Sequence, residues 1–485
     1  MILNELLKDV RVKELKGRAD VEISDLTFDS RQVHAGTLFV AQPGTTVDGH
    51  DFIGKAIEQG AAAVVCEHIP AEVASVGSTD TTFVVVDNSS EALGLLASAW
   101  NGYPSRHLTL IGVTGTNGKT TIATLLYKLT RAMGHQAGLL STVVNYVNDE
   151  AIEATHTTPD ALELNGLLHK MVDAGCEYAF MEVSSHAIAQ HRTAGLDFDG
   201  ALFTNLTRDH IDYHKTFENY RDTKKQLFDN LKKEAFAVTN KDDKNGLVMT
   251  QNCRAHVTTY STRSLADYKA QILEEGFDGM LLNVNGQEVF VHLVGRFNVS
   301  NLLCIYGAAV NLGFEPQEVL RVLSTLSAVK GRFEAIHSPK GWTAIVDYAH
   351  TPDAVENVLR TINEIRKEGS QVITVVGCGG NRDKGKRPMM ASIAKKNSTR
   401  LILTSDNPRD EEPADILNDM IAGLTEEEKK DTLVIEDRET AIKTACMLAG
   451  NNDVILIAGK GHEDYQIIKG VKHHFDDHEV VKANL

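Results

Sequence analysis

The chain has 485 residues, 42% of them hydrophobic, and a formal net charge of −17. This length indicates two to four domains, and the apolar fraction is typical of a soluble globular protein. The negative charge argues against nonspecific nucleic-acid binding, and no apolar run reaches the ~18 residues of a membrane span. The six scattered cysteines lack a C-x-x-C pair, and the first ten residues carry too short an apolar run for a signal peptide. Both features favour a cytoplasmic protein without a zinc or disulfide framework.

The first part of the chain, residues 1–104, mixes short strands with helices. GTLFVAQPG (36–44) and AAAVVCE (61–67) each predict a strand and a turn, and DFIGKAIEQG (51–60) predicts a short amphipathic helix between them. NGYPSR (101–106) has the composition of a linker. We therefore expect a small N-terminal α/β domain.

The second part, residues 105–333, begins with the apolar run LTLIGVTG (108–115), which is typical of a buried parallel strand. KTTIATLLYKLTRAMG (119–134) has helical periodicity and ends at a glycine. Between them, TGTNGKTT (114–121) is a Gly-rich turn in the strand-to-helix context of phosphate loops, although its G-x-x-G-K-T spacing is two residues shorter than usual. The later apolar runs YAFMEV (178–183) and GALFTNL (200–206) predict a largely parallel sheet.

The third part, residues 334–485, contains four apolar runs that each end in a turn with Gly, Asp or His. The runs are TAIVDYAH (343–350), QVITVVGCGG (371–380), RLILTSDNP (400–408) and DVILIAGKG (453–461). Helical stretches separate them, which predicts a doubly wound, Rossmann-like domain with ligands at the carboxyl ends of its strands. The expected fold class is α/β with three domains, and the central one is a P-loop-type ATPase domain.

Acidic and histidine side chains follow two of the central strands. They are Glu182, Asp209, His210, Asp212 and His214. In a phosphate loop Lys119 would contact the β- and γ-phosphates and Thr120 would offer a hydroxyl to Mg²⁺, which also needs carboxylate ligands. Each acidic residue alone could be a solvated loop residue. Two such strand ends behind one phosphate loop favour a shared metal–phosphate site, and hence an ATP-using enzyme.

A series of motifs in the same order resembles the Mur ligases, most closely the MurE type. The motifs are TGTNGKTT, HTTPD, MEVSSHAIAQHR, FTNLTRDHIDYH, YRDTKKQLF, GRFNVSN, VDYAHTPDAVE, GCGGNRDKGKRP, SDNPRDEEP and GKGHEDYQ. The resemblance spans the chain from DSR (29–31) to FDDHE (475–479), and the short phosphate loop is the form that this family and the folylpolyglutamate synthetases use. It implies an ATP-dependent acid–amino-acid ligase that works through an acyl phosphate in peptidoglycan synthesis, and so serves cell-wall biogenesis, cell shape and cell division. It also implies a monomer without nucleic-acid or membrane partners.

The resemblance implies an ATP site and two Mg²⁺ ions. The ATP residues would be Thr114, Gly115, Thr116, Asn117, Gly118, Lys119, Thr120, Asn298, Asn301, Arg332, Asp347 and His350. The metal ligands would be Thr120, Glu182, His210 and Lys224, the last as a carbamate (N6-carboxylysine), and the catalytic group would be Lys119, Glu182, His210 and Lys224. Two alternatives stay open: Lys224 could be an ordinary surface lysine beside Lys225, and Asn298 could be a helix N-cap.

The resemblance also implies sites for the two joined substrates. The UDP-N-acetylmuramoyl-L-Ala-D-Glu residues would be Ser30, Thr157, Thr158, Ser184, Gln190 and Arg192, of which the Ser and Thr residues could equally be loop caps. The meso-diaminopimelate residues would be Arg382, Asp406, Asn407, Pro408, Arg409, Gly459 and Glu463. The UDP-sugar part is expected to bind the N-terminal domain.

Arg409, in DNPR (406–409), bears on the choice of amino acid. Diaminopimelate differs from lysine by a second carboxylate, which a guanidinium can pair bidentately. A site built around Arg409 would leave a buried charge unpaired when lysine binds, which is costly. Alternatively, Arg409 could form a surface salt bridge with Asp410, Glu411 or Glu412. One departure is Asn381, which stands where many relatives have Asp.

Two other functions compete with this interpretation. A folylpolyglutamate synthetase-like ligase would share the chemistry, but the additional N-terminal domain and the DNPR segment argue against it. A regulatory nucleotide-binding protein with a degenerate site is disfavoured because Lys119, Thr120, Glu182, His210 and Lys224 are all present.

Overall fold

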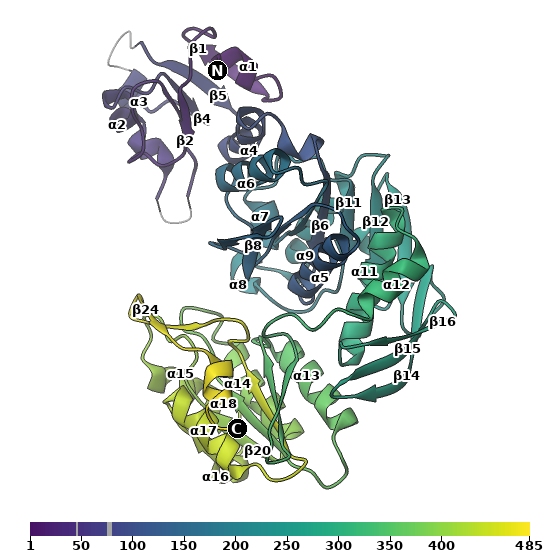
Figure 1. The fold of residues 1–485 in the computed structure, drawn as a ribbon. Helices are drawn as coiled ribbons and strands as arrows, with labels where there is room; N and C mark the ends of the chain where they lie inside the picture. The colour runs from purple at the N-terminus through teal and green to yellow at the C-terminus, as the bar shows by residue number, and fades with distance from the viewer. Residues whose placement is uncertain (45–46, 75–79) are drawn as a thin grey trace.

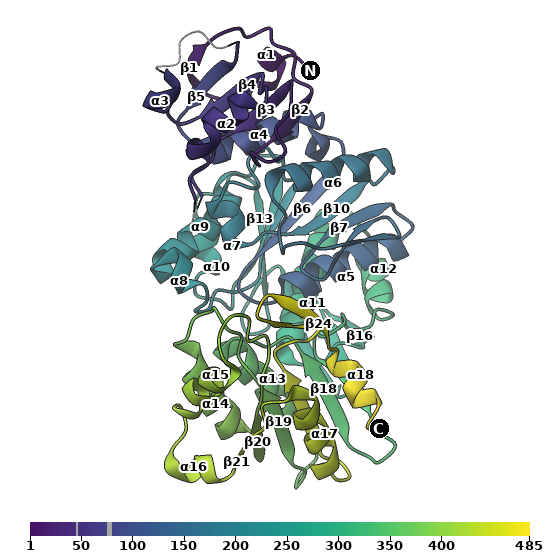
Figure 2. The ribbon, with the colours of Figure 1, turned by 90° about the vertical axis from the view of Figure 1, so that its left-hand side faces the viewer.

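A computed structural model describes residues 1–44, 47–74 and 80–485. Three units, each built on its own main β-sheet, follow one another along the molecule from the N-terminal to the C-terminal part of the chain (Figures 1 and 2). The predicted three-domain α/β fold is confirmed, whereas the boundaries placed at residues 104 and 333 stay predictions. In the part of the chain that the structure describes, no helix is long and apolar enough to cross a bilayer.

The N-terminal unit holds a five-stranded sheet in the order β1-β5-β4-β3-β2. The strands β2 to β5 are parallel and β1 pairs with β5 in the antiparallel sense. The strands are β1 (Val12–Lys16), β2 (Asp25–Thr27), β3 (Thr37–Val40), β4 (Ala63–Cys66) and β5 (Thr82–Val86). The helices are α1 (Leu3–Leu6), α2 (Ile53–Glu58), α3 (Ala71–Ala74) and α4 (Ser89–Trp100), with 3₁₀ turns at Gly49–Phe52 and Pro104–Arg106. The strands and the helix predicted between residues 36 and 67 are confirmed.

The central unit holds a sheet in the order β16-β15-β14-β13-β12-β11-β6-β10-β7-β8-β9. Its parallel part is β14 (Tyr268–Gly276), β13 (His256–Ser261), β12 (Phe236–Asn240), β11 (Gly200–Phe203), β6 (Thr109–Thr114), β10 (Tyr178–Glu182) and β7 (Ala137–Leu140). Antiparallel strands extend both edges: β8 (Val144–Val147) and β9 (Glu150–Glu153) at one, β15 (Gly279–Val284) and β16 (Gln287–Val291) at the other. The predicted parallel sheet is thus confirmed for its middle, while the antiparallel edges were not predicted.

Helices cover both faces of the central sheet. The helices are α5 (Lys119–Ala132), α6 (Ala161–Asp173), α7 (Ser185–Ala189), α8 (Ile211–His214), α9 (Phe217–Asp229), α10 (Gly246–Met249), α11 (Arg296–Asn311) and α12 (Pro316–Leu323). Apolar side chains of α5, α11 and α12 share one core with the sheet, and those of α6, α7 and α9 share a second. The β6 strand lies between β11 and β10 and is buried along almost its whole length. The turn that follows it therefore lies at the carboxyl edge of the parallel strands.

The C-terminal unit is a doubly wound sheet in the order β17-β18-β22-β19-β20-β21, in which only β17 is antiparallel. The strands are β17 (Glu334–His337), β18 (Thr343–Asp347), β19 (Val372–Val376), β20 (Arg400–Leu403), β21 (Thr432–Val434) and β22 (Val454–Ala458), with a separate hairpin of β23 (Tyr465–Ile468) and β24 (Val471–His474). The helices are α13 (Pro352–Ile365), α14 (Lys386–Asn397), α15 (Pro413–Ile421), α16 (Glu426–Lys430), α17 (Arg438–Leu448) and α18 (Asp477–Lys482). The α13, α14 and α15 helices pack on one face and α17 and α18 on the other. All four predicted strands are confirmed.

Candidate functional site

A cavity of about 1400 Å³ lies between the central and C-terminal units. Its walls come from the turns after β6, β10, β11, β18, β19, β20 and β22, and from β14 and the start of α11. These are the carboxyl ends of strands in two parallel sheets, where open α/β sheets bind ligands. Among the described residues, none before Thr116 lines the cavity.

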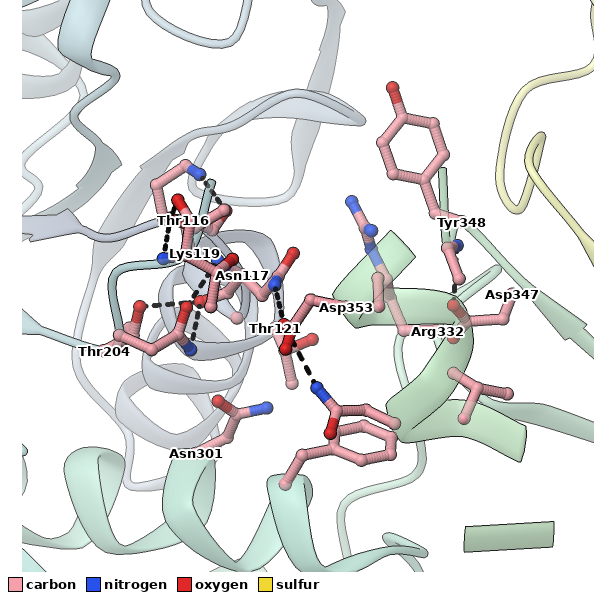
Figure 3. Close-up of a pocket in the computed structure, with 18 of the residues that line it drawn as sticks. Thr116, Asn117, Lys119, Thr121, Thr204, Asn301, Arg332, Asp347, Tyr348 and Asp353 are labelled. Atoms are coloured by element: carbon pink, nitrogen blue, oxygen red, sulfur yellow. Dashed lines mark hydrogen bonds between the residues drawn. The ribbon is translucent and has the colours of Figure 1, made fainter. Parts of the chain in front are cut away.

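The turn of residues 114–121 forms a tight loop at the start of α5 (Figure 3). Gly115 and Gly118 have φ angles of 148° and 90°, and a Cβ at Gly115 would lie 1.9 Å from Thr204 Oγ1, so glycine is needed there. Lys119 Nζ donates to the carbonyl oxygens of Gly115 (3.0 Å) and Thr116 (2.8 Å). Burial lowers the pKa of Lys119 below its ordinary value, against the opposing charges of nearby carboxylates. The loop therefore combines an open helix N-terminus with a lysine, which is the arrangement that binds phosphate.

Neighbouring residues of the loop divide between the cavity and the interior. Thr116, Asn117, Gly118 and Thr120 line the cavity. Thr114 does not, because its hydroxyl is buried and donates to Val183 O at 2.8 Å, which ties β6 to β10. The role predicted for Thr114 can therefore involve its backbone alone.

The four predicted metal ligands lie in the loop or close to it. Glu182 is 1% exposed at the end of β10, and its Oε1 accepts from Thr142 N at 2.8 Å. Thr120, Glu182 and His210 line the cavity, whereas Lys224 lies directly behind the loop and donates to Gly115 O at 2.9 Å. Three of the four groups, a hydroxyl, a carboxylate and a carbamate, would offer the oxygen donors that Mg²⁺ prefers, and the imidazole of His210 would offer a nitrogen. Among the described residues, no group of three or more His, Cys, Asp and Glu side chains could hold a metal, so the fit depends on the hydroxyl and a modified lysine.

Lys224 is not a surface lysine. Its side chain is 1% exposed, its Nζ lies 4.8 Å from the centre of the Tyr220 ring, and burial followed by the charge of Lys119 lowers its pKa well below the ordinary value. The surface alternative is therefore wrong. A neutral buried amine is the form that can react with carbon dioxide to give a carbamate.

His210 has a φ of 53° at the start of α8, with its ring 3.3 Å from Asp209. Burial lowers the pKa of His210 to about 4, so its imidazole is neutral at neutral pH and able to coordinate a cation. Asp209 was recognised at this strand end but was not assigned a role. It lines the cavity beside His210.

The residues predicted for the rest of the nucleotide occupy two layers. Asn301 lines the cavity and donates to Asn298 Oδ1 at 2.9 Å, while Asn298 lies behind it and donates to Val294 O at 2.8 Å. The N-cap alternative for Asn298 is wrong, because the N-cap of α11 is Gly295 and Asn298 lies inside the first turn. Asn298 thus orients Asn301 rather than facing the cavity.

Arg332, which lies just before β17, and Asp347 and His350 of the C-terminal unit also line the cavity. Figure 3 shows Arg332 and Asp347 on this side. The Arg332 guanidinium lies 4.4 Å from the centre of the Tyr348 ring and donates to Thr120 Oγ1 at 3.1 Å, so it bridges the two units. Asp347 accepts from Phe333 N and Ala349 N, both at 2.7 Å, and burial raises its pKa. These two hydrogen bonds to Asp347 therefore hold the turn that follows β18 and carries His350.

The predicted sugar–peptide residues are partly brought together. Arg192 donates to Thr158 O at 2.7 Å and to Gln190 Oε1 at 2.6 Å, and Thr158 Oγ1 lies 3.4 Å from Ser184 Oγ. The Ser184 hydroxyl is also the N-cap of α7, so the cap alternative holds for this residue. Thr157 and Ser184 line the cavity, and Thr158, Gln190 and Arg192 lie beside it.

Ser30 is not part of this group. It is half-buried in the N-terminal unit, after β2, and outside the cavity.

The predicted amino-acid residues gather at the far end of the cavity. Those that line it are Arg382, Asp406, Asn407, Arg409, Gly459 and Glu463, while Pro408 does not line it. Arg409 donates to Gly380 O at 2.8 Å, and among the described residues no carboxylate forms an ion pair with it. The surface-salt-bridge alternative is therefore wrong. Burial raises the pKa of Glu463, and nearby Asp406 raises it further. Two guanidinium groups beside two carboxylates suit a ligand with both carboxylate and ammonium groups.

Several residues that line the cavity or lie beside it were missed by the sequence analysis. Lys460 is fully buried beside the cavity, 3.3 Å from Glu463 Oε2 and 3.7 Å from Asp406 Oδ1. Asp353 accepts from Asn117 Nδ2 at 3.2 Å across the two units (Figure 3). Lys460 and Asp353 lie in the motifs GKGHEDYQ and VDYAHTPDAVE, so their position beside assigned residues was an available signal. Asp242, Asp243, Arg263 and residues 270–275 also line the cavity, and no local motif indicates them.

Three family models match: the "Mur ligase family, catalytic domain" over residues 22–101, the "Mur ligase middle domain" over 113–309 and the "Mur ligase, glutamate ligase domain" over 331–461. The chain is 61% identical to the UDP-N-acetylmuramoyl-L-alanyl-D-glutamate--2,6-diaminopimelate ligase of Parabacteroides distasonis, over 99% of this chain and 98% of that one. It is 44% identical to the protein of the same name from Bacillus cereus, over 96% and 94%.

Two solved structures are also similar to this chain. A structure of a UDP-N-acetylmuramoyl-L-alanyl-D-glutamate--2,6-diaminopimelate ligase matches with a TM-score of 0.70 and 33% identity, over 100% of this chain and 98% of that one. The Mycobacterium tuberculosis folylpolyglutamate synthase matches with a TM-score of 0.62 and 16% identity, over 76% and 91%. The second likeness concerns the fold alone.

Proposed function

The chain belongs to the Mur ligase family, and on this premise we propose that it is the ligase that adds meso-2,6-diaminopimelate to UDP-N-acetylmuramoyl-L-Ala-D-Glu in peptidoglycan precursor synthesis. The observation that carries the choice of amino acid is Arg409, a guanidinium in the cavity wall without a carboxylate partner among the described residues. The second carboxylate of diaminopimelate can pair with Arg409, whereas lysine has no second carboxylate. We further expect the protein to act as a cytoplasmic monomer.

The phosphate loop and Arg332 hold the ATP phosphates in this proposal. Lys119 Nζ already lies over the loop, where it can exchange its two carbonyl contacts for phosphate oxygens. The Arg332 guanidinium reaches Thr120 from the other unit, so ATP would be contacted from both sides of the cavity. Bound Mg²⁺, held by Thr120, Glu182, His210 and the carbamate of Lys224, would neutralise the charge that builds up on the transferred phosphate.

The reaction that this arrangement supports has two steps. A carboxylate oxygen of the D-Glu residue forms a bond to the γ-phosphorus while the bond from that phosphorus to ADP breaks. The neutral amine of diaminopimelate then adds to the acyl carbon, inorganic phosphate leaves, and the amine nitrogen releases its proton. The chain's part is positioning and charge stabilisation, because two anions must approach each other.

The amino-acid end of the cavity orients the amine. Arg382 and Arg409 would pair with the carboxylates, while Asp406 and Glu463 would accept from the ammonium at the distal centre. Buried groups that are left unpaired make the wrong substrate costly, so the same residues that bind diaminopimelate reject lysine.

Phosphate release from ATP tests the proposal. Release should require both UDP-N-acetylmuramoyl-L-Ala-D-Glu and diaminopimelate, and Lys119→Ala should abolish it while the protein stays folded. Lys128→Ala, on the same helix but outside the cavity, is the matched control and should keep full activity. Full turnover by the Lys119→Ala protein would refute the assignment of the phosphate loop.

A further inference from the structure

Two loops carry the two arginines of the amino-acid end, and their backbones are in direct contact. The first, residues 379–382, follows β19, and the second, residues 406–411, follows β20. Gly380 N donates to Asn407 O at 2.9 Å, and the Arg409 side chain donates to Gly380 O at 2.8 Å. A Cβ at Gly380 would lie 1.9 Å from Pro408 O, so the contact has no room for a side chain.

Both loops contain a backbone conformation that non-glycine residues rarely adopt. Asn381 and Arg409 each have a φ of 53°, in the left-handed region. Asparagine tolerates this region, but for arginine it stores strain that the surrounding structure must hold in place. The Arg382 and Arg409 side chains also repel each other, and burial together with this repulsion lowers the pKa of Arg382. The two loops therefore need an attachment that keeps the guanidinium groups together before an anion arrives.

Arg387 and Glu411 provide that attachment from outside the cavity. The Arg387 side chain is fully buried at the start of α14, and its NH1 and NH2 donate to Glu411 Oε2 at 2.9 Å and Oε1 at 2.8 Å. Glu411 Oε1 also accepts from Asn381 N at 2.6 Å, and Arg387 NH2 donates to Gly379 O at 3.3 Å. A single carboxylate thus joins the end of the second loop to the first loop and to α14, yet neither Arg387 nor Glu411 lines the cavity.

We propose that Arg387 and Glu411 are positioning residues that set the selectivity of the amino-acid site by holding the loops of Arg382 and Arg409 at one spacing. The inference rests on the proposed function and deepens it. A bidentate charge-assisted pair fixes direction as well as distance, so it can hold a planar guanidinium where a second carboxylate would meet it. Arg409 N donates to Ile467 O at 3.0 Å and Lys469 N donates to Arg409 O at 2.6 Å, so the hairpin of β23 and β24 also holds the Arg409 backbone. Without the pair, the first loop loses its hydrogen bond from Asn381 N to Glu411, and the spacing between the two guanidinium groups can change.

Asp419 offers a matched control within the same cluster. Arg387 NH1 also donates to Asp419 Oδ2 at 2.8 Å, but Asp419 lies on α15 and, among the described residues, forms no hydrogen bond or ion pair with either loop. Removing its charge takes an ion pair from the same buried arginine without detaching the loops. A purely structural role for Arg387 predicts the same result for both carboxylates, and a positioning role does not.

The test compares Glu411→Gln and Asp419→Asn with the unmodified protein. For each, kcat and KM are measured for meso-diaminopimelate, L-lysine and ATP, together with the melting temperature. In the Glu411→Gln protein we expect the diaminopimelate KM to rise about 10-fold, a loss of about one charge-assisted hydrogen bond, while the ATP KM stays within about 2-fold. The preference for diaminopimelate over lysine should fall in the same proportion. The Asp419→Asn protein should keep its preference even if it melts earlier.

Three outcomes overturn the inference. One is an unchanged preference in the Glu411→Gln protein, another is an equal loss in the Asp419→Asn protein, and the third is a parallel rise in the ATP KM. If the Glu411→Gln protein does not fold, Glu411→Asp keeps the charge but shortens the side chain, and the same loss of preference is expected. If the unmodified protein releases no phosphate with diaminopimelate, the proposed function fails with the inference. If it does and the preference survives Glu411→Gln, only the inference fails.

Discussion

Replacing Gly118 by alanine should damage ATP binding by an amount that the structure allows us to work out. Gly118 has a φ of 90°, which costs an L-residue about 1–2 kcal/mol. A Cβ there would also lie 2.5 Å from Asn301 Oδ1, and Asn301 cannot easily move because it donates to Asn298 at 2.9 Å. Forcing an additional methyl group into a packed site costs about 1–3 kcal/mol, and this clash acts on the phosphate loop itself.

A substitution at Gly134 measures the backbone cost of a positive φ without the steric clash. Gly134 follows the C-terminal end of the same helix with a φ of 92°, and no atom lies within 4 Å of its Cβ position. Gly134→Ala should therefore lower stability by about 1–2 kcal/mol and leave the ATP KM unchanged. Gly118→Ala should add a rise in the ATP KM of about 5-fold to 150-fold, which is the clash of about 1–3 kcal/mol expressed as affinity.

The assay is steady-state phosphate release at varied ATP, with thermal unfolding measured on the same samples. Because the clash depends on the Asn301 side chain, Gly118→Ala combined with Asn301→Ala should cost less than the sum of the two single changes. An ATP KM in the Gly118→Ala protein no higher than in the Gly134→Ala protein would refute the reasoning.

Three further predictions concern other parts of the chain. Arg409→Gln should reduce kcat/KM for diaminopimelate by about 30-fold or more, because a carboxylate of the substrate is then left unpaired. The kcat/KM for ATP should change far less. Equal losses of kcat/KM for diaminopimelate and for ATP would count against a contact between Arg409 and the amino acid. Lys224→Ala should reduce turnover about 10-fold to 100-fold, and added short carboxylates should restore part of it; undiminished turnover would rule out the carbamate. His478 is buried, which alone would lower its pKa, but hydrogen bonds to the carboxylates of Glu334 and Asp476 raise it above 6.5. Its contribution to stability is therefore complete below pH 6.5 and lost as the pH rises through the raised pKa, so the melting temperature of His478→Gln should depend less on pH above 6.5; an unaltered dependence would refute this assignment.

The sequence predicted the phosphate loop and the parallel strands because their signals are local. The buried run before residue 115, the glycines and the helix after them are adjacent in the sequence. Each can therefore be recognised from its own residue types and periodicity. The strand ends of the C-terminal unit were predictable for the same reason. Their apolar runs are short, and they stop at polar turns.

Other parts depend on contacts between distant residues, which spacing does not reveal. Lys224 donates to Gly115 O across 109 positions of the chain, and its burial follows from that packing alone. Arg387 is likewise a basic residue in a polar stretch until Glu411 and Asp419 are placed beside it. The acidic residues next to Arg409 in the sequence therefore suggested a salt bridge with Arg409. In the structure, Glu411 pairs with Arg387 instead.

The antiparallel edge of the central sheet could have been predicted. Asp278-Gly279 and Asn285-Gly286 separate three segments of alternating polarity, and such dipeptides are strong signals of β-hairpins. Residues 270–275, which line the cavity, belong to the first of these strands. The hairpin signals thus predict these strands, but they do not predict that residues 270–275 line the cavity.

The identity of the amino acid is the central claim, and a competition experiment tests it most directly. The unmodified protein would be given ATP, UDP-N-acetylmuramoyl-L-Ala-D-Glu and equal concentrations of meso-diaminopimelate and L-lysine, and the products would be separated by mass. We predict that the diaminopimelate product forms in large excess, because only that substrate pairs its second carboxylate with Arg409. Equal amounts of the two products would contradict the account.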